Sequence, residues 1–128
     1  MTRSYRLGDL QLRIMKILWR GGTAGVSAVH EELASETPLA YTTVATMLRK
    51  MEARGLVKHQ KHGRRFVYTA AVPADAVTRS MANDVIDRLF EGSLAGMVSH
   101  LLSTREISAG ELRELEKLIA ARKKREER

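Results

Sequence analysis

Hydrogen-bond donors gather on one side of a helix that the sequence predicts over residues 41–55. At 100° per residue, the inner stripe is apolar and has Tyr41 and Met47 at its margins; its members are Val44, Leu48 and Met51. The opposite arc carries hydroxyls, cations and a methyl group but no carboxylate: Thr42, Thr43, Thr46, Arg49, Lys50 and Ala53. Small side chains allow close approach, and Thr, Arg and Lys suit phosphates and base edges. We therefore expect this helix to dock in the major groove of DNA; the alternative is a merely Thr-rich surface helix.

Other residue types that could support catalysis or bind metal do not form a recognisable site. The segment His30–Ala34 begins like a zinc-protease helix but lacks the second histidine at its fifth position. His59 and His62 have no carboxylate or thiol near them in sequence, so we interpret them as solvated or phosphate-contacting. The chain has no cysteine, no Gly-rich phosphate loop and no nucleophile elbow. A small hydrolase would need a nucleophile–base pair, which the sequence does not offer, and we expect no enzyme activity, cofactor or metal.

The charge is divided unevenly along the 128 residues. Residues 1–72 hold 12 Lys and Arg against 5 acids, a net charge of +7, whereas residues 73–128 hold 10 of each sign. This asymmetry indicates a polyanionic partner for the first part and a different role for the second. No apolar run approaches the roughly 18 residues of a membrane span and no signal peptide opens the chain, so we expect a cytoplasmic protein without membrane insertion.

The elements around the Thr-lined helix follow a familiar order. Residues 1–6 form a short basic arm, either mobile or lying on the DNA backbone; helices over residues 7–20 and 26–35 follow, with a short link or β-bridge at 23–25. After the helix, residues 56–60 and 65–70 predict a β-hairpin with Gly63 at its tip. The hairpin is cationic: Lys58, His59, Lys61, His62, Arg64 and Arg65. Three helices followed by a basic hairpin predict a winged helix-turn-helix, with the hairpin over the neighbouring backbone or minor groove.

The remaining residues predict a second, helical region after a hinge near Pro73. Helices are expected over residues 75–90, over 94–102 and from the N-cap Ser108, followed by a frayed charged tail at 122–128. Each of these helices is apolar over a broad arc, but three such helices are too few residues to form an adequate core alone. We therefore expect a second copy of the chain to complete the core. The residues assigned to this homodimer contact are Val77, Met81, Val85, Leu89, Phe90, Leu94, Met97, Val98, Leu101, Leu102, Leu112, Leu115 and Leu118.

Several stretches together resemble the penicillinase-repressor family (the BlaI/MecI/CopY group). They are LGDLQLRIMKILWRGG, VSAVHEEL, LAYTTVATMLRKMEARGLVKHQKHGRRFVYTAAV and LFEGSLAGMVSHLL, which span nearly the whole chain. The resemblance implies a dimeric winged-helix repressor that binds TACA/TGTA-type dyads through its third helix. It also implies a sensor-linked protease that cuts between Asn and Phe, where this chain has His100–Leu101. Copper-responsive members bind metal through C-terminal cysteines, which this chain lacks.

These observations predict a mainly α protein with a winged DNA-binding domain at residues 1–72 and a helical dimerisation domain at 73–128. We expect it to be a repressor that binds a palindromic operator as a homodimer, in the control of a β-lactam or cell-envelope stress response. The residues predicted to contact DNA are Tyr41, Thr42, Thr43, Thr46, Arg49, Lys50, Lys61, Arg64 and Arg65. The alternative function is a winged-helix module that binds a protein partner in place of DNA.

Overall fold

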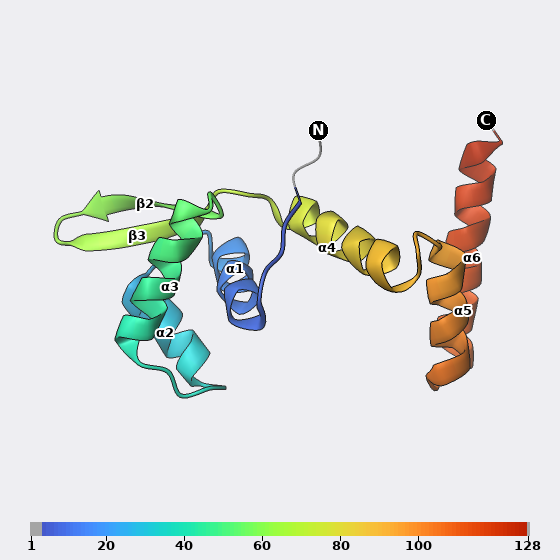
Figure 1. Ribbon diagram of the computed structural model, residues 1–128, viewed down its shortest axis with the longest axis horizontal. Coiled ribbons are helices and arrows are strands. Elements are labelled where there is room, and N and C mark those ends of the chain that lie inside the picture. The colour runs from blue at the N-terminus through green and yellow to red at the C-terminus, as the bar shows by residue number, and fades with distance from the viewer. Residues whose placement is uncertain (1–3, 128) are drawn as a thin grey trace. The chain divides into compact units, whose positions relative to one another are not determined.

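The computed structural model describes residues 4–127 (Figure 1). The chain divides into two compact units, with the boundary between Asp84 and Val85. The elements of the first unit are α1 (Asp9–Gly21), β1 (Thr23–Gly25), α2 (Val26–Ala34), α3 (Tyr41–Ala53), β2 (Val57–His62) and β3 (Arg65–Ala70). Helix α4 (Ala74–Leu89) begins in the first unit and ends in the second, which also holds α5 (Leu94–Thr104) and α6 (Ala109–Glu126). The predicted fold class, mainly α with a small β-hairpin wing, is confirmed. The functional boundary between residues 72 and 73 stays a prediction, since the two units are defined by packing alone.

The core of the first unit forms where the apolar stripes of its three helices meet. The helical period brings the following side chains to 0 or 1% exposure: Ile14, Met15, Leu18, Val29, Leu33, Val44, Leu48 and Met51. Trp19 packs beside this cluster, and its indole Nε1 donates to the Val72 carbonyl at 2.9 Å. Gly55 turns the chain from α3 into the wing. Its φ of 79° is a backbone conformation that favours glycine. The core therefore fixes one face of α3 and leaves the other outward.

Three antiparallel strands form the sheet, in the order β1-β3-β2. The link at residues 23–25 is a short strand whose Ala24 pairs with Tyr68, so it extends the hairpin by a third strand. In the hairpin, His59 pairs with Tyr68 and His62 with Arg65, and Gly63 takes a φ of 65° in the turn. Tyr68 and Phe66 lie on the same face of β3, but Tyr68 is buried and Phe66 is 47% exposed. The difference arises because Phe66 is nearer the tip of the hairpin, beyond the helices that cover Tyr68.

Both chain ends differ from the expectation. Tyr5 and Arg6 are held to the first unit by hydrogen bonds and are not a mobile arm, while contact of this segment with the DNA backbone stays a prediction; residues 1–3 lie outside the described residues. The prediction of a frayed tail at residues 122–128 is also wrong, because α6 continues to Glu126. Arg128 lies outside the described residues. An i,i+4 pair between Arg122 and Glu126 and the cations of the last turn both favour helix there. Ser108 caps α6 as predicted, accepting from the Glu111 amide at 3.0 Å.

Val77 and Met81 lie elsewhere than expected. The Val77 side chain is 1% exposed inside the core of the first unit, and Met81 packs against the same cluster. The beginning of α4 therefore closes the winged unit: Val77 is inaccessible to a second chain, and the partly buried Met81 packs within the same unit. We remove both from the predicted dimer contact.

The second unit has apolar side chains but no buried ones among its described residues. Its exposed large apolar residues are Val85, Leu89, Leu94, Val98, Leu102, Leu112, Leu118 and Ile119, with Leu89 at 71% and Leu94 at 60%. Helices α5 and α6 line an apolar hollow that includes Leu101 and Leu115. None of the helices described, residues 4–127, combines the length and apolarity that crossing a membrane requires.

Candidate nucleic-acid interface

Helix α3 presents the predicted polar arc outward. Pro38 and the extended Ala40 precede its first turn, which contains no acid, and three fully buried residues anchor its inner face. Thr42, Thr43, Arg49 and Lys50 are exposed, and Thr46 is partly exposed. Tyr41, also predicted to contact DNA, is 48% exposed. Its ring makes an edge-to-face contact with the His30 ring, with the two ring centroids 5.9 Å apart. This arrangement confirms the geometry of the predicted face; DNA contact by each residue stays a prediction.

The outer face of α3 is shallowly hollowed. Its lining consists of three threonines, one methionine and one lysine: Thr42, Thr43, Thr46, Met47 and Lys50. The Arg49 Nη2 reaches back to the Thr46 hydroxyl at 3.3 Å, so the guanidinium lies along the same face. Such a surface lets a polyanion approach the helix closely and supplies donors for phosphate and base edges.

The single acid of α3 is satisfied within the protein. Glu52 accepts from His59 Nδ1, which lies 2.7 Å from both carboxylate oxygens. His59 is exposed, as expected, and its contact with phosphate stays a prediction. Its carboxylate partner was not expected, because only the turn at Gly55, which folds the wing back, brings the two residues together. The His59 ring also contacts the rings of Phe66 and Tyr68 in tilted arrangements, with ring centroids 4.6 and 5.6 Å away. No cluster of three or more His, Asp or Glu side chains suited to a metal occurs within residues 4–127.

Tyr68 carries the one clear electrostatic perturbation of this site. Burial raises the pKa of the Tyr68 phenol above its ordinary value of 10.0, and the negative charge of Glu52 raises it further, while Arg49 lowers it. Tyr68 belongs to the buried core of the first unit, which is why burial is the larger cause of the raised pKa.

The wing is a second cationic surface. Its cations are exposed and, among the residues described, none of them forms an ion pair: Lys58, Lys61, Arg64 and Arg65. Arg64 and Arg65 lie at the tip and share a hollow with Tyr41 and with α2, whose Glu31 is the one acid in the lining. Cations without internal partners repel one another unless an anion lies across them. The wing and the start of α3 thus face a common space in which two arginines outnumber one carboxylate.

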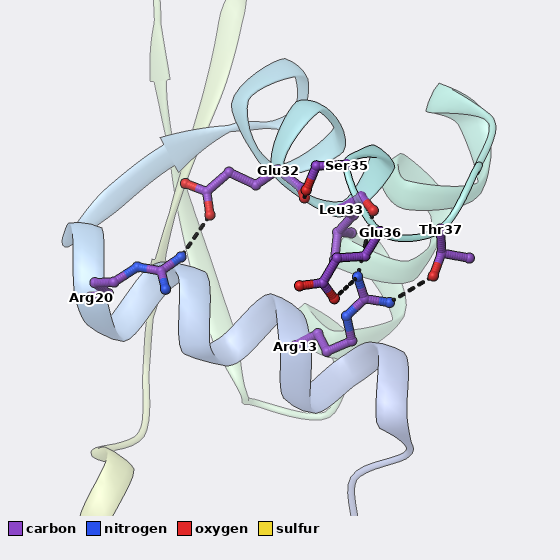
Figure 2. A network of polar contacts seen from close by, with 7 residues as sticks. All are labelled: Arg13, Arg20, Glu32, Leu33, Ser35, Glu36 and Thr37. Atoms are coloured by element: carbon purple, nitrogen blue, oxygen red, sulfur yellow. Dashed lines mark hydrogen bonds and ion pairs between the residues drawn. The ribbon is translucent and has the colours of Figure 1, made fainter.

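A polar network fixes the turn between α2 and α3 (Figure 2). The guanidinium of Arg13 in α1 lies 2.9 Å from a Glu36 carboxylate oxygen and donates to the Thr37 hydroxyl at 3.2 Å. Arg20, two turns further along α1, pairs with Glu32 at 2.7 Å. Sequence reasoning counted both arginines only as basic charge. Their helical spacing of seven residues was a signal that both face the same neighbour.

The sequence analysis assigned no role to Arg54, the residue that directly follows α3. It donates to the Arg6 carbonyl at 2.9 Å and to Gln11 Oε1 at 3.2 Å. Its position at the C-terminal end of α3, where a cation complements the helix dipole, was the signal available in the sequence. The partners could not have been found, since Arg6 lies 48 residues away.

The fold and the outward cationic face define a winged-helix DNA-binding protein. The model of the penicillinase repressor family matches residues 7–121, and the chain belongs to this family, whose members are transcriptional repressors and not enzymes. The Bacillus licheniformis penicillinase repressor is 27% identical over 98% of both chains. The Mycobacterium tuberculosis transcriptional regulator BlaI is 33% identical over 87 residues, 67% of this chain and 63% of that protein. The monomeric form of Bacillus licheniformis BlaI, solved in complex with the blaP half-operator, superimposes with a TM-score of 0.51 at 29% identity, covering 59% of this chain and 93% of the other.

Proposed function

We propose that this protein represses transcription by binding a two-fold DNA operator as a homodimer, with one α3 helix in the major groove of each half-site. The observation that carries the proposal is the outward face of α3. It is exposed, contains no unpaired acid and adjoins the unpaired cations of the wing. The complex of a related repressor with a half-operator supports DNA as the ligand.

The two cationic surfaces have different roles in this proposal. Arg49 and the three threonines of α3 contact bases and nearby phosphates, because they lie where the helix can approach a groove floor. Tyr41 and Lys50 flank them. The wing residues Lys61, Arg64 and Arg65 contact phosphates and add affinity that does not depend on sequence.

The second unit joins two copies of the chain. Its exposed leucines and valines form an apolar surface that a monomer would leave in water, and a two-fold partner would bury it. The contact residues proposed after removal of Val77 and Met81 are Val85, Leu89, Phe90, Leu94, Met97, Val98, Leu101, Leu102, Leu112, Leu115 and Leu118. A two-fold dimer matches a palindromic operator, since each reading helix then meets an equivalent half-site.

The names of the relatives indicate the regulated process. A penicillinase repressor and methicillin resistance regulators among them favour genes of a β-lactam or cell-envelope stress response, in the cytoplasm where the DNA lies. The resemblance also implies a sensor-linked protease as the partner that ends repression. At the corresponding place in α5 this chain has His100–Leu101, so such a protease would have to accept a pair other than Asn–Phe.

Selection of bound fragments from a random double-stranded DNA pool tests the proposal. We expect enriched duplexes with two inverted half-sites, whose spacing reports the distance between the two α3 helices. We also expect weaker binding to random duplex, which falls by a few orders of magnitude from low to physiological salt if about 6–10 phosphates are neutralised. Absence of binding even at low salt would contradict the proposal and favour a protein partner.

A further inference from the structure

The segment that precedes α1 ties itself to helix α4. We call Ser4–Gly8 the arm. The Tyr5 amide donates to the Ser80 hydroxyl at 2.8 Å, across 75 residues of sequence, and the Arg6 guanidinium lies 3.9 Å from the Asp84 carboxylate. The Tyr5 and Leu7 side chains pack against the core of the first unit. The arm is therefore a fixed part of this unit (Figure 1).

The same arm is tied to the C-terminal end of the reading helix. Arg54, directly after α3, donates through Nη2 to the Arg6 carbonyl at 2.9 Å and through Nη1 to Gln11 Oε1 at 3.2 Å. That amide oxygen also accepts from the Gly8 amide at 3.1 Å, and the Gln11 nitrogen lies 3.6 Å from the sulfur of Met47 in α3. One guanidinium and one amide side chain thus connect the arm to α3.

The two attachments lie at opposite ends of the arm's contacts, one at the C-terminal end of α3 and the other on α4, the helix that continues into the second unit. Ser80 and Asp84 are one helical turn apart on α4, in its last stretch inside the first unit, and the same helix continues without a break to Leu89. We propose that the arm is a brace between the reading helix and α4, and that Arg54 and Ser80 are its positioning residues. The brace fixes the direction in which α4 leaves the winged unit, and through it the spacing of the two α3 helices in the dimer. This inference rests on the proposed function.

Such a brace affects binding in a particular way. Each α3 helix makes its own contacts whether or not the brace is intact, so affinity for one half-site stays the same. Binding of the second half-site depends on the effective concentration of the second helix, which falls when the spacing of the pair is less well defined. The expected signature is therefore a loss confined to DNA with two half-sites.

Arg54 could instead contact a phosphate through its charge, and Arg54→Lys separates the two roles. Lysine keeps the charge, but its single ammonium cannot reproduce the forked bonds to Arg6 and Gln11. Ser80→Ala removes the acceptor at the other end, and Ser80→Thr restores a hydroxyl. Arg79→Ala is the matched control, since Arg79 is on the same helix and pairs with Asp75 one turn away.

The experiment measures binding to two synthetic duplexes, one with two selected half-sites at the selected spacing and one with a single half-site. We expect Arg54→Lys and Ser80→Ala each to weaken binding to the two-site duplex about fivefold and to the one-site duplex less than about twofold. The double variant should bind the two-site duplex as tightly as the single variant with the lower affinity, because both changes open the same brace. Ser80→Thr and Arg79→Ala should bind like the parent protein. Sedimentation and Trp19 fluorescence confirm that each variant is folded and dimeric.

Three outcomes would overturn the inference, and they are distinguishable. Equal loss on both duplexes for Arg54→Lys would make Arg54 a direct DNA contact. Unchanged binding to both duplexes for Ser80→Ala and Arg54→Lys would show that the brace has no part in spacing. Parent protein that binds the two-site duplex no more tightly than the one-site duplex would contradict the proposed dimeric function itself.

Discussion

The imidazole of His59 lies against the carboxylate of Glu52, with Nδ1 2.7 Å from both oxygens. Glu52 is the one acid of α3, and His59 lies on the first strand of the wing. The contact joins the two parts of the DNA-binding surface at their base. It also engages the one carboxylate of α3 in a hydrogen bond and holds that carboxylate against the base of the wing.

A double-mutant cycle on these two residues should show coupling. We expect Glu52→Ala and His59→Ala to have a coupling energy of up to about 1 kcal/mol in the free energy of unfolding, since the pair is partly exposed. Urea titration followed by the fluorescence of Trp19, the single tryptophan, reports on this unit. Strictly additive effects would show that the contact does not stabilise the junction between α3 and the wing.

Tyr68 should make the winged unit sensitive to alkali. Its pKa is raised in the folded protein, first by burial and then by Glu52, so the folded state retains the proton after the unfolded chain has lost it. The stabilisation is fully present below the ordinary pKa of 10.0 and is lost as the pH rises through the folded value. Tyr68→Phe cannot lose a phenolic proton. The difference in unfolding free energy between parent and variant should be constant below about pH 9 and should shrink above it. A constant difference across the alkaline range would contradict the assignment.

The regular elements were predictable because their sequence periods reflect burial directly. The stripe of Val44, Leu48 and Met51 and the change of period after Gly55 placed α3 and the wing. Val77 was misassigned because an apolar band on α4 does not reveal which unit each residue faces. The contacts of Glu52 with His59 and of Arg54 with Arg6 depend on chain reversals that no local pattern encodes.

The wing should contribute affinity without sequence preference. Arg64→Ala and Arg65→Ala should each remove one phosphate contact per chain, which reduces the slope of log affinity against log salt by about 0.9 for each chain bound. The preferred operator sequence should not change. Arg122→Ala, in the second unit, removes the same charge and serves as the control. A narrowed or altered sequence preference would contradict the phosphate-only role of these arginines.

The apolar surface of the second unit should hold the dimer together. Leu118 is 59% exposed in the single chain, and Leu118→Asp would place a charge in the proposed contact. We expect the dimer dissociation constant to rise by about two orders of magnitude, since each buried leucine contributes about 1.5–3 kcal/mol. Sedimentation at several concentrations measures it, with Lys117→Asp as the neighbouring control. A parent protein that remains monomeric at high concentration would disprove the contact.

Replacement of Arg49 tests the central claim most directly, because this residue lies on the outward face of α3 beside Thr46 and takes no part in the core. The measurement compares the affinity of Arg49→Ala for the selected operator and for a scrambled duplex at the same salt concentration. If α3 reads the major groove, the operator affinity falls by about tenfold or more while the scrambled duplex changes far less. Equal loss on the two duplexes would contradict base reading by this face, and no loss on either would contradict its contact with DNA.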